Sequence, residues 1–447
     1  MKKVLLIYPT LPAVATQPPL GLMYIASYLR QAGHSPSIIE GNAETISHLR
    51  TDVDVIGITC MTSMYHEVIR MRDHFRKFQP DIPLVFGGPH ATIMPESLLF
   101  VDDGQQFVIQ GEGEKAMLSI VEGNISGSSI IRGDPVADLD ELPFPARDLV
   151  DQKYLKHSVS MLASRGCPRS CSFCQPTLRK IFGNRIRRRS EWNVVKEMEK
   201  VNEDFKVRDF EFFDDTFTSE KNWVYDFCEQ LALAQERARD DYWGLPYTWK
   251  CLSRVDMLDY DLLKTMKSVG LTKLSLGIES GSQEILDSYQ KGITVDQAHK
   301  ALEWCKELGI KVHGFFMIGA LEETRKTVDE TRQFIRNHEF DTIFVTVTTP
   351  TPCTFLYDRA QAEDALRVGW EQFDLLGGLT TTVKPRRPEE TVPLVGYYME
   401  PEQILKARFE ILREFYLKKL WDPLYLVRFL RQNGLKYSFE AVRNVFH

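Results

Sequence analysis

The chain has 447 residues, of which 43% are hydrophobic and 26% are charged, as in ordinary globular proteins. The formal net charge of −7 argues against nucleic acid as the main partner, and no run reaches the ~18 apolar residues that a membrane span needs. The length predicts two or three domains. Eight cysteines suit a reducing compartment, so we expect a cytoplasmic protein.

The first residues imitate a secretion signal, because Val4 to Tyr8 form an apolar run after two lysines. Pro9 and Pro12 interrupt the run, so a buried first strand is the better interpretation. Further strands are predicted at 37–40, 54–60, 83–86 and 107–110, and helices at 18–29 and 64–78. The alternation predicts a doubly wound, Rossmann-like parallel sheet, an α/β fold over residues 1–133.

Small residues and hydroxyls follow these predicted strands. Ligands of such sheets bind beyond the carboxyl ends of the strands, where small side chains let a ligand approach closely. The candidate contacts in this region are Thr10, Thr59, Thr62, Ser63, Gly87, Gly88, His90 and Gly111.

Residues 134–152 are rich in proline and acid and predict a linker. A second series of strands is predicted at 158–164, 209–213, 247–252, 273–278, 311–318 and 342–348. Helices are predicted at 191–202, 221–237, 259–268, 295–308 and 322–337. Six strand–helix units predict a partial (β/α)6 barrel, similar to a TIM barrel, over residues 153–352.

Residues 353–447 are predicted to be mainly helical. The stretch 401–419 is amphipathic, and we interpret it as a helix packed on the barrel. The alternatives are a lid, a peripheral membrane contact or part of a hydrophobic substrate channel.

Three cysteines, Cys167, Cys171 and Cys174, form a C-x3-C-x2-C array after the first barrel strand. A four-iron cluster with three protein thiolates leaves one iron for an exchangeable ligand, whereas closed zinc sites prefer four protein ligands. No second cysteine pair exists, since the other cysteines are dispersed. The array therefore predicts a four-iron cluster, with a zinc knuckle or three buried cysteines as the alternative interpretation.

This loop, with Phe173 before its last cysteine, resembles the signature of the radical S-adenosylmethionine (SAM) superfamily. The run from Gly87 to Thr92 and the Gly-Glu-Gly-Glu run at 111–114 resemble the cobalamin-binding domain that precedes many radical SAM domains. The resemblance covers roughly residues 1 to 350. It is strongest to the branch of class B methyltransferases and the anaerobic magnesium-protoporphyrin monomethyl ester cyclase.

The resemblance implies three cofactors: a [4Fe–4S] cluster on the three cysteines, SAM and cobalamin. The partners that it implies are a small-molecule substrate and an external electron donor of the flavodoxin or ferredoxin type. The cobalt-ligating Asp-x-His-x-x-Gly motif is absent, so His66 and His90 are weak ligand candidates. A Rossmann-like domain that has lost cobalamin is the alternative.

The same resemblance implies SAM contacts at the ends of the barrel strands. Asp214 and Asp215 would receive the ammonium group, although a helix N-cap is the competing interpretation. Ser253 and Arg254 would meet the ribose and the carboxylate. The remaining contacts are Glu279 at the ribose hydroxyls and the segment that ends at Gly319 along the adenine.

Two further groups of residues have weaker interpretations. The basic run of Arg185, Arg187, Arg188 and Arg189 is expected to be a solvated face, with contact to a cofactor phosphate as the alternative. Cys353 and Tyr357 follow the last barrel strand and are candidates for a hydrogen or proton donor.

The predicted reaction is cobalamin-dependent methylation of an unactivated carbon, started by the 5′-deoxyadenosyl radical. The alternative is radical oxidation, cyclisation or carbon–carbon coupling without methyl transfer. A third hypothesis, a binding protein without catalysis, explains the polar strand ends of the barrel less well.

Overall fold

The computed structural model describes residues 1–10, 17–46, 49, 51–100, 104–156, 158–175, 177–183, 185–238, 246–373 and 391–420. The chain divides into two compact units. The first unit contains Met1–Arg169 and Pro176–Trp249, and the second unit contains Ser170–Gln175 and Lys250–His447. The predicted domain boundaries, which follow a different division, stay a prediction.

The first unit begins with a six-stranded parallel sheet in the order β2-β1-β3-β4-β5-β6. Its strands are β1 (Lys3–Pro9), β2 (Ser35–Gly41), β3 (Val55–Thr59), β4 (Leu84–Gly87), β5 (Gln106–Gly111) and β6 (Ser129–Gly133). The doubly wound parallel sheet predicted for this region is confirmed. The sequence did not predict β6, in which only one residue is fully buried.

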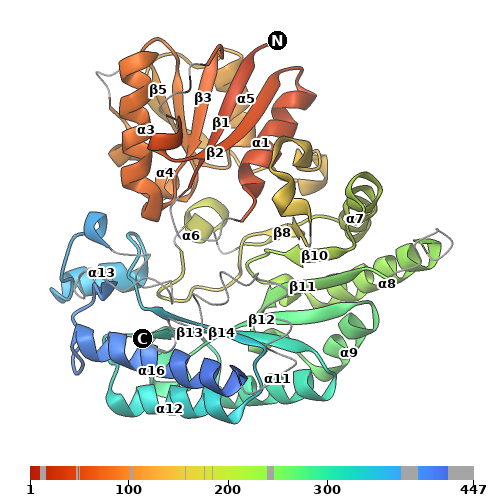
Figure 1. Ribbon diagram of the computed structural model, residues 1–447, viewed down its shortest axis with the longest axis vertical. Helices are drawn as coiled ribbons and strands as arrows, with labels where there is room; N and C mark the ends of the chain where they lie inside the picture. Colours follow the sequence, from red (N-terminus) through yellow and green to blue (C-terminus); the bar gives the residue numbers. More distant parts are fainter. Residues whose placement is uncertain are drawn as a thin grey trace. The chain divides into compact units, whose positions relative to one another are not determined.

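Helices cover both faces of this sheet (Figure 1). They are α1 (Leu20–Gln31), α2 (Ala43–Ile46), α3 (Tyr65–Phe78), α4 (Pro89–Ile93) and α5 (Glu114–Val121). On one face α3 buries Val68 and Phe75 against the strands. On the other face α1 and α5 bury Leu29 and Met117. Burial of apolar side chains on both sides explains why the strands are apolar runs without alternation.

The barrel strands form a second six-stranded sheet in the order β7-β10-β11-β12-β13-β14. They are β7 (Val159–Met161), β10 (Asp209–Phe212), β11 (Thr248–Ser253), β12 (Leu271–Glu279), β13 (Lys311–Ile318) and β14 (Thr342–Val347). In the first unit β7 and β10 pair in parallel, and in the second unit β12, β13 and β14 pair in parallel. The unit boundary falls within β11. All six predicted barrel strands are confirmed.

Two short strands, β8 (Ser164–Arg165) and β9 (Arg187–Arg188), pair antiparallel. The helices of this region are α6 (Thr177–Phe182), α7 (Glu191–Phe205), α8 (Lys221–Ala238), α9 (Tyr260–Ser268), α10 (Gln283–Ser288), α11 (Val295–Glu307), α12 (Arg325–Asn337), α13 (Phe355–Ala362) and α16 (Pro401–Leu420). The 3-10 helices are η1 (Thr62–Met64), η2 (Pro95–Leu98), η3 (Leu139–Glu141), η4 (Arg147–Leu149), η5 (Gln152–Leu155), η6 (Phe217–Ser219), η7 (Val255–Met257) and η8 (Trp370–Gln372).

The amphipathic helix α16 packs on the barrel, next to α12 (Figure 1). Arg408 donates from Nε to the carbonyl oxygen of Val345 at 2.8 Å, and Tyr416 donates to that of Ile343 at 3.2 Å. The interpretation as a packed helix is therefore confirmed. No described helix is both long and apolar enough to cross a membrane.

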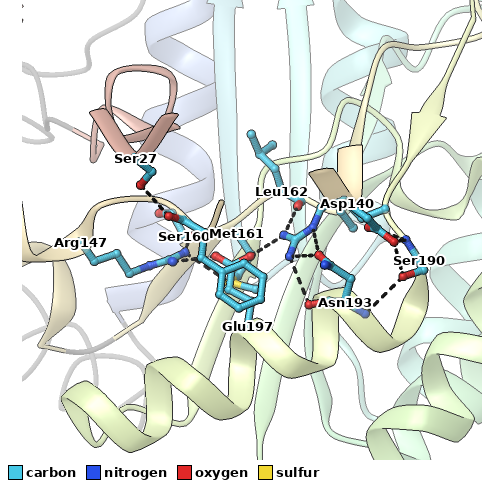
Figure 2. A network of polar contacts seen from close by, with 12 residues as sticks. Ser27, Asp140, Arg147, Ser160, Met161, Leu162, Ser190, Asn193 and Glu197 are labelled. Carbon is cyan, nitrogen blue, oxygen red and sulfur yellow. Dashed lines mark hydrogen bonds and ion pairs between the residues drawn. The ribbon is translucent and has the colours of Figure 1, made fainter. Parts of the chain in front are cut away.

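The segment predicted as a linker is anchored in the first unit by a buried polar network (Figure 2). Glu197 of α7, 1% exposed, forms ion pairs with Arg147 of η4 and with Arg189. Arg147 also donates to the carbonyl oxygen of Ser160 at 2.9 Å. Burial alone would raise the pKa of Glu197, but Arg189 and Arg147 hold it below its ordinary value.

The same network reaches α1 and the start of α7. Asp140 accepts from the backbone N–H of Ser190 at 3.0 Å and from its hydroxyl at 2.5 Å. Ser27 of α1 donates to the carbonyl oxygen of Phe144 at 2.6 Å. Figure 2 shows these contacts leading from the linker toward α1 at one end and toward α7 at the other. The linker therefore joins two parts of the first unit by specific contacts.

We expect Glu197→Gln to lower the free energy of unfolding by about 3–5 kcal/mol, because two buried guanidinium groups lose their common carboxylate. Urea unfolding followed by circular dichroism measures the change. Lys200→Ala on the same helix is the control, since its ion pair with Asp204 is exposed and its loss should leave the midpoint unchanged. Equal midpoints for both variants would contradict a stabilising role of the network.

Candidate functional site

Two of the three cysteines of the array lie in the second unit. Cys171 is buried, Cys174 is half-buried, and the Cys174 N–H donates to the carbonyl oxygen of Cys171 at 3.1 Å. Ser172 between them donates its N–H to the carbonyl oxygen of Tyr289 and accepts from the N–H of Leu356, both at 2.9 Å. These backbone contacts hold the loop in place from two sides.

Aromatic packing supports the same loop. The ring of Phe173 packs edge-on against that of Tyr289, with 5.1 Å between the centroids. Tyr289 is 1% exposed, and its hydroxyl bonds to that of Thr348, directly after β14. The aromatic residue that the sequence singled out before the last cysteine therefore anchors the loop to the second unit.

Cys167, the first cysteine of the array, lies in the first unit. Its Sγ is 3.5 Å from the hydroxyl oxygen of Thr216, which follows β10. Gly166 before it has a φ of 100°, a conformation that side chains other than glycine rarely adopt. All three cysteines are thiols without a disulfide. Soft thiols with polar donors beside them fit an iron–sulfur cluster.

No three His, Cys, Asp or Glu side chains are gathered as ligands of a metal ion within the described part of the chain. The assignment of the three cysteines as cluster ligands therefore rests on their spacing and their chemistry, and it stays a prediction.

The two aspartates at the end of β10 differ in environment. Asp214 is fully buried and accepts from the N–H of Ala163 at 3.1 Å and from the hydroxyl of Ser164. Burial raises its pKa. Asp215 is exposed and accepts from the N–H of Gly166. Asp214 thus fixes the segment before the cysteine loop instead of starting a helix, and Asp215 is the better candidate for the SAM ammonium.

In the second unit, Arg254 after β11 is 4% exposed and already has several partners. It donates to the Asp256 carboxylate at 2.9 Å, to the carbonyl oxygen of Lys291 at 2.6 Å and to Cys171 Sγ at 3.3 Å. Ser253 before it is also buried. The predicted contact of Arg254 with the SAM carboxylate stays a prediction, although Asp256 occupies its Nε.

Glu279 at the end of β12 has a φ of 69°, which is strained for a residue with a side chain. Its carboxylate is paired with Lys291 at 2.7 Å, and both side chains are buried. The Lys291 ammonium also lies 5.7 Å from the centroid of the Phe173 ring. Nothing in the sequence distinguishes Lys291, because it stands in an ordinary turn before Gly292.

Gly319 after β13 has a φ of 92°, and a Cβ there would lie 3.1 Å from Ile404 of α16. Its N–H donates to Glu323 at 3.1 Å. Glu323 is 2% exposed, and burial raises its pKa to about 7. Nothing in the sequence distinguishes Glu323 from the neighbouring Glu322, so a buried titratable group beside a predicted SAM contact was missed.

The candidate cobalamin contacts lie at the carboxyl ends of β1, β3, β4 and β5. Gly88 has a φ of 92°, and a Cβ there would lie 2.5 Å from the Thr59 hydroxyl oxygen. A Cβ on Gly87 would meet no atom within 4 Å. Gly88 is therefore required by close packing against Thr59 and Cys60, whereas the open position at Gly87 fits close backbone approach to a flat cofactor.

The backbone N–H groups of two other members of this set already have partners within the first unit. The Gly111 N–H donates to the Thr92 hydroxyl at 3.2 Å, and the Thr10 N–H donates to the carbonyl oxygen of Gly41 at 2.9 Å. These two backbone N–H groups are therefore not available to a ligand, and the contact of Thr10 and Gly111 with cobalamin stays a prediction.

His90 is fully buried in the first unit. Its Nδ1 is 3.2 Å from the Thr62 hydroxyl oxygen, and its Nε2 is 3.0 Å from that of Ser97. Burial lowers its pKa to about 4, so the imidazole is neutral at pH 7. With both ring nitrogens hydrogen-bonded, His90 fits a structural role better than ligation of cobalt.

The interpretation of the basic run as a solvated face is wrong for three of its four arginines. Arg187 is paired with Glu112, Arg188 donates to Ser219, and Arg189 is buried and paired with Glu197. Only Arg185 is exposed. Their partners include groups far away in the sequence, such as Glu112 for Arg187. The sequence of the basic run alone therefore cannot show that these arginines are paired.

Glu112 and Glu114 of the Gly-Glu-Gly-Glu run also bind Arg165, two residues before Cys167. Arg165 forms ion pairs with Glu114 at 2.6 Å and with Glu112 at 3.3 Å. Glu112 accepts from the N–H of Val136 at 2.7 Å as well. The run therefore connects β5 and α5 to the start of the cysteine loop.

Cys353 and Tyr357 flank the start of α13. Cys353 is half-buried with a φ of 68°, and the Tyr357 N–H donates to the Thr354 hydroxyl at 3.0 Å. Burial raises the pKa of Tyr357. Their role as donors stays a prediction.

Comparison with known proteins gives two family matches. Residues 11–121 match the B12 binding domain, and residues 161–335 match the radical SAM superfamily. The chain is 31% identical to an uncharacterized methyltransferase of Pyrococcus horikoshii, over 92% of this chain and 95% of that protein. The chain belongs to the cobalamin-binding radical SAM enzymes.

Two further members show the range of this family. The anaerobic magnesium-protoporphyrin IX monomethyl ester cyclase of Rubrivivax gelatinosus is 28% identical over 76% of this chain and 66% of its own. The structure of the radical SAM methyltransferase TsrM from Kitasatospora setae, with cobalamin and a [4Fe–4S] cluster bound, matches with a TM-score of 0.64 at 16% identity. That match covers 83% of this chain and 80% of TsrM and shows the shared fold. As a cobalamin-binding radical SAM enzyme, the chain uses a [4Fe–4S] cluster, SAM and cobalamin.

Replacing any one of Cys167, Cys171 and Cys174 by alanine should abolish iron binding after anaerobic reconstitution and leave cobalt binding intact, because the two cofactors use different residues. Metal analysis after desalting measures both. Cys305→Ala is the matched control, because this buried thiol belongs to helix α11 and not to the cysteine loop. Retention of about four irons in a Cys171→Ala variant would contradict the ligand assignment.

Glu323→Gln should stabilise the protein more at pH 8 than at pH 5. The pKa of Glu323 rises from 4.5 to about 7 on folding, so the folded state holds an extra proton in this window and stability falls as the pH rises through it. A neutral glutamine removes this loss, which amounts to about 2–3 kcal/mol. Unfolding midpoints of both proteins at the two pH values test this. An equal difference at both pH values would show that burial does not perturb this carboxyl.

Proposed function

We propose that the chain is a cobalamin-dependent radical SAM methyltransferase that methylates an unactivated carbon of a small molecule. The observation that carries this proposal is the similarity to an uncharacterized methyltransferase along nearly the whole chain. In this chain a B12 binding domain match precedes a radical SAM match. The proposed substrate is a small molecule of unidentified structure.

When bound, the cofactors supply the one-electron cleavage of SAM, the hydrogen abstraction and the methyl group. The chain's own residues would bind these cofactors and orient them. The thiols of Cys167, Cys171 and Cys174 hold the cluster, and the exposed Asp215 carboxylate receives the SAM ammonium. Gly87, beside which a Cβ would meet no atom within 4 Å, would let the backbone approach the corrin closely.

The proposed external partner is a one-electron donor of the flavodoxin or ferredoxin type, because the cluster must be reduced before SAM is cleaved. A cytoplasmic location would supply such donors and keep the thiols reduced. Both statements rest on the cofactor chemistry.

A second candidate function is radical oxidation or cyclisation without methyl transfer. The similarity to the Rubrivivax gelatinosus cyclase over 76% of this chain favours it. The two candidates use the same SAM cleavage and differ in whether SAM also gives up its methyl group.

The test is anaerobic reconstitution of the full chain with iron, sulfide and hydroxocobalamin, followed by metal analysis and incubation with SAM and a low-potential reductant. We expect about four irons and one cobalt per chain, and both 5′-deoxyadenosine and S-adenosylhomocysteine as SAM products. S-adenosylhomocysteine reports methyl donation. Deoxyadenosine without S-adenosylhomocysteine would favour the second candidate, and zinc in place of iron would contradict both.

A further inference from the structure

Arg254 contacts the sulfur atom of one of the three cysteines of the array. Its Nη1 lies 3.3 Å from Sγ of Cys171, within the hydrogen-bond range for sulfur. The guanidinium is 4% exposed and Cys171 is 7% exposed, so bulk water screens this contact little. Both residues lie in the second unit.

Three other contacts fix the guanidinium in this orientation. Nε donates to Asp256 Oδ1 at 2.9 Å, and Nη2 donates to Asp256 Oδ2 at 3.4 Å. Nη2 also donates to the carbonyl oxygen of Lys291 at 2.6 Å. With Nε and Nη2 engaged in this way, Nη1 is directed at the thiol.

The charges around this contact are nearly balanced. Asp256 neutralises Arg254 at short range, and Glu279 neutralises Lys291 in the neighbouring buried pair. A net change of one charge at either Arg254 or Asp256 therefore changes the potential at the Cys171 sulfur, with opposite signs for the two residues.

We propose that Arg254 is a positioning residue that raises the reduction potential of the iron–sulfur cluster, by donating a hydrogen bond to the Cys171 thiolate, and that Asp256 limits this rise. This inference rests on the proposed ligation of the cluster by Cys171. Reduction adds one electron from the external donor to the cluster and makes its sulfur ligands stronger acceptors. An N–H donor and a positive charge at the sulfur therefore stabilise the reduced state.

A different role for Arg254 would give a different result. If its main partner were the SAM carboxylate, Arg254→Gln would weaken SAM binding and leave the potential of the SAM-free cluster unchanged. If it only held the loop in shape, Arg254→Gln and Asp256→Asn would disturb the cluster in the same direction, because both break the same ion pair.

The experiment compares Arg254→Gln and Asp256→Asn in the reconstituted full chain. The midpoint potential of the cluster is measured without SAM, by electron paramagnetic resonance during titration with titanium(III) citrate. We expect Arg254→Gln to lower the ratio of reduced to oxidised cluster about tenfold at a fixed ambient potential, which is a shift of about −59 mV for one electron. Asp256→Asn should shift the potential upward.

Two further variants complete the design. Arg254→Lys retains the positive charge and should lie between the wild type and Arg254→Gln. Arg332→Gln, which removes a partly exposed ion pair between Arg332 of α12 and Glu414 of α16, should change nothing.

Unchanged potentials, or shifts of the same sign in Arg254→Gln and Asp256→Asn, would overturn the inference. If Arg254→Gln does not retain iron, the sign of the Asp256→Asn shift decides. A wild-type chain that binds no iron would refute the proposed function itself, which is a separate result.

Discussion

The first unit depends on one buried carboxylate. Glu197 is buried and forms ion pairs with Arg147 of the linker and with Arg189, which directly follows β9. Removing a carboxylate from water costs several kcal/mol unless its partners are close and well oriented. The carboxylate therefore needs both guanidinium groups at the same time, and this requirement brings together the linker, the residue after β9 and α7.

The second unit also pairs its buried donors with acceptors of its own. Arg254 serves a carboxylate, a carbonyl oxygen and a thiol, and Lys291 serves Glu279. Because the donors of these two side chains are hydrogen-bonded, each side chain is held in one orientation. A rotation would leave a buried polar group without its partner. A site prepared in this way loses little conformational freedom when a ligand binds.

The fold could be predicted from the sequence because its signals are local. Apolar runs such as Val4 to Tyr8, and the helical period of 401–419, are read within one turn or one strand. The site could be predicted only where a motif is contiguous, as at the cysteine loop. Lys291 and Glu323 were missed because burial and long-range pairing define their roles, and the solvated interpretation of Arg187 to Arg189 failed for the same reason.

The two neighbouring aspartates at the end of β10 would give mutants with different phenotypes. Asp214 and Asp215 are chemically identical and adjacent, and a screen of inactive mutants would place both in one class. Loss of Asp214 releases the strand that leads into the cysteine loop, so its phenotype would come from assembly and would follow temperature. Loss of Asp215 leaves those contacts intact and removes its hydrogen bond with the Gly166 N–H; if Asp215 receives the SAM ammonium as proposed, its phenotype would follow the concentration of SAM. A temperature series and a SAM series would thus separate two alleles that a single activity measurement cannot tell apart.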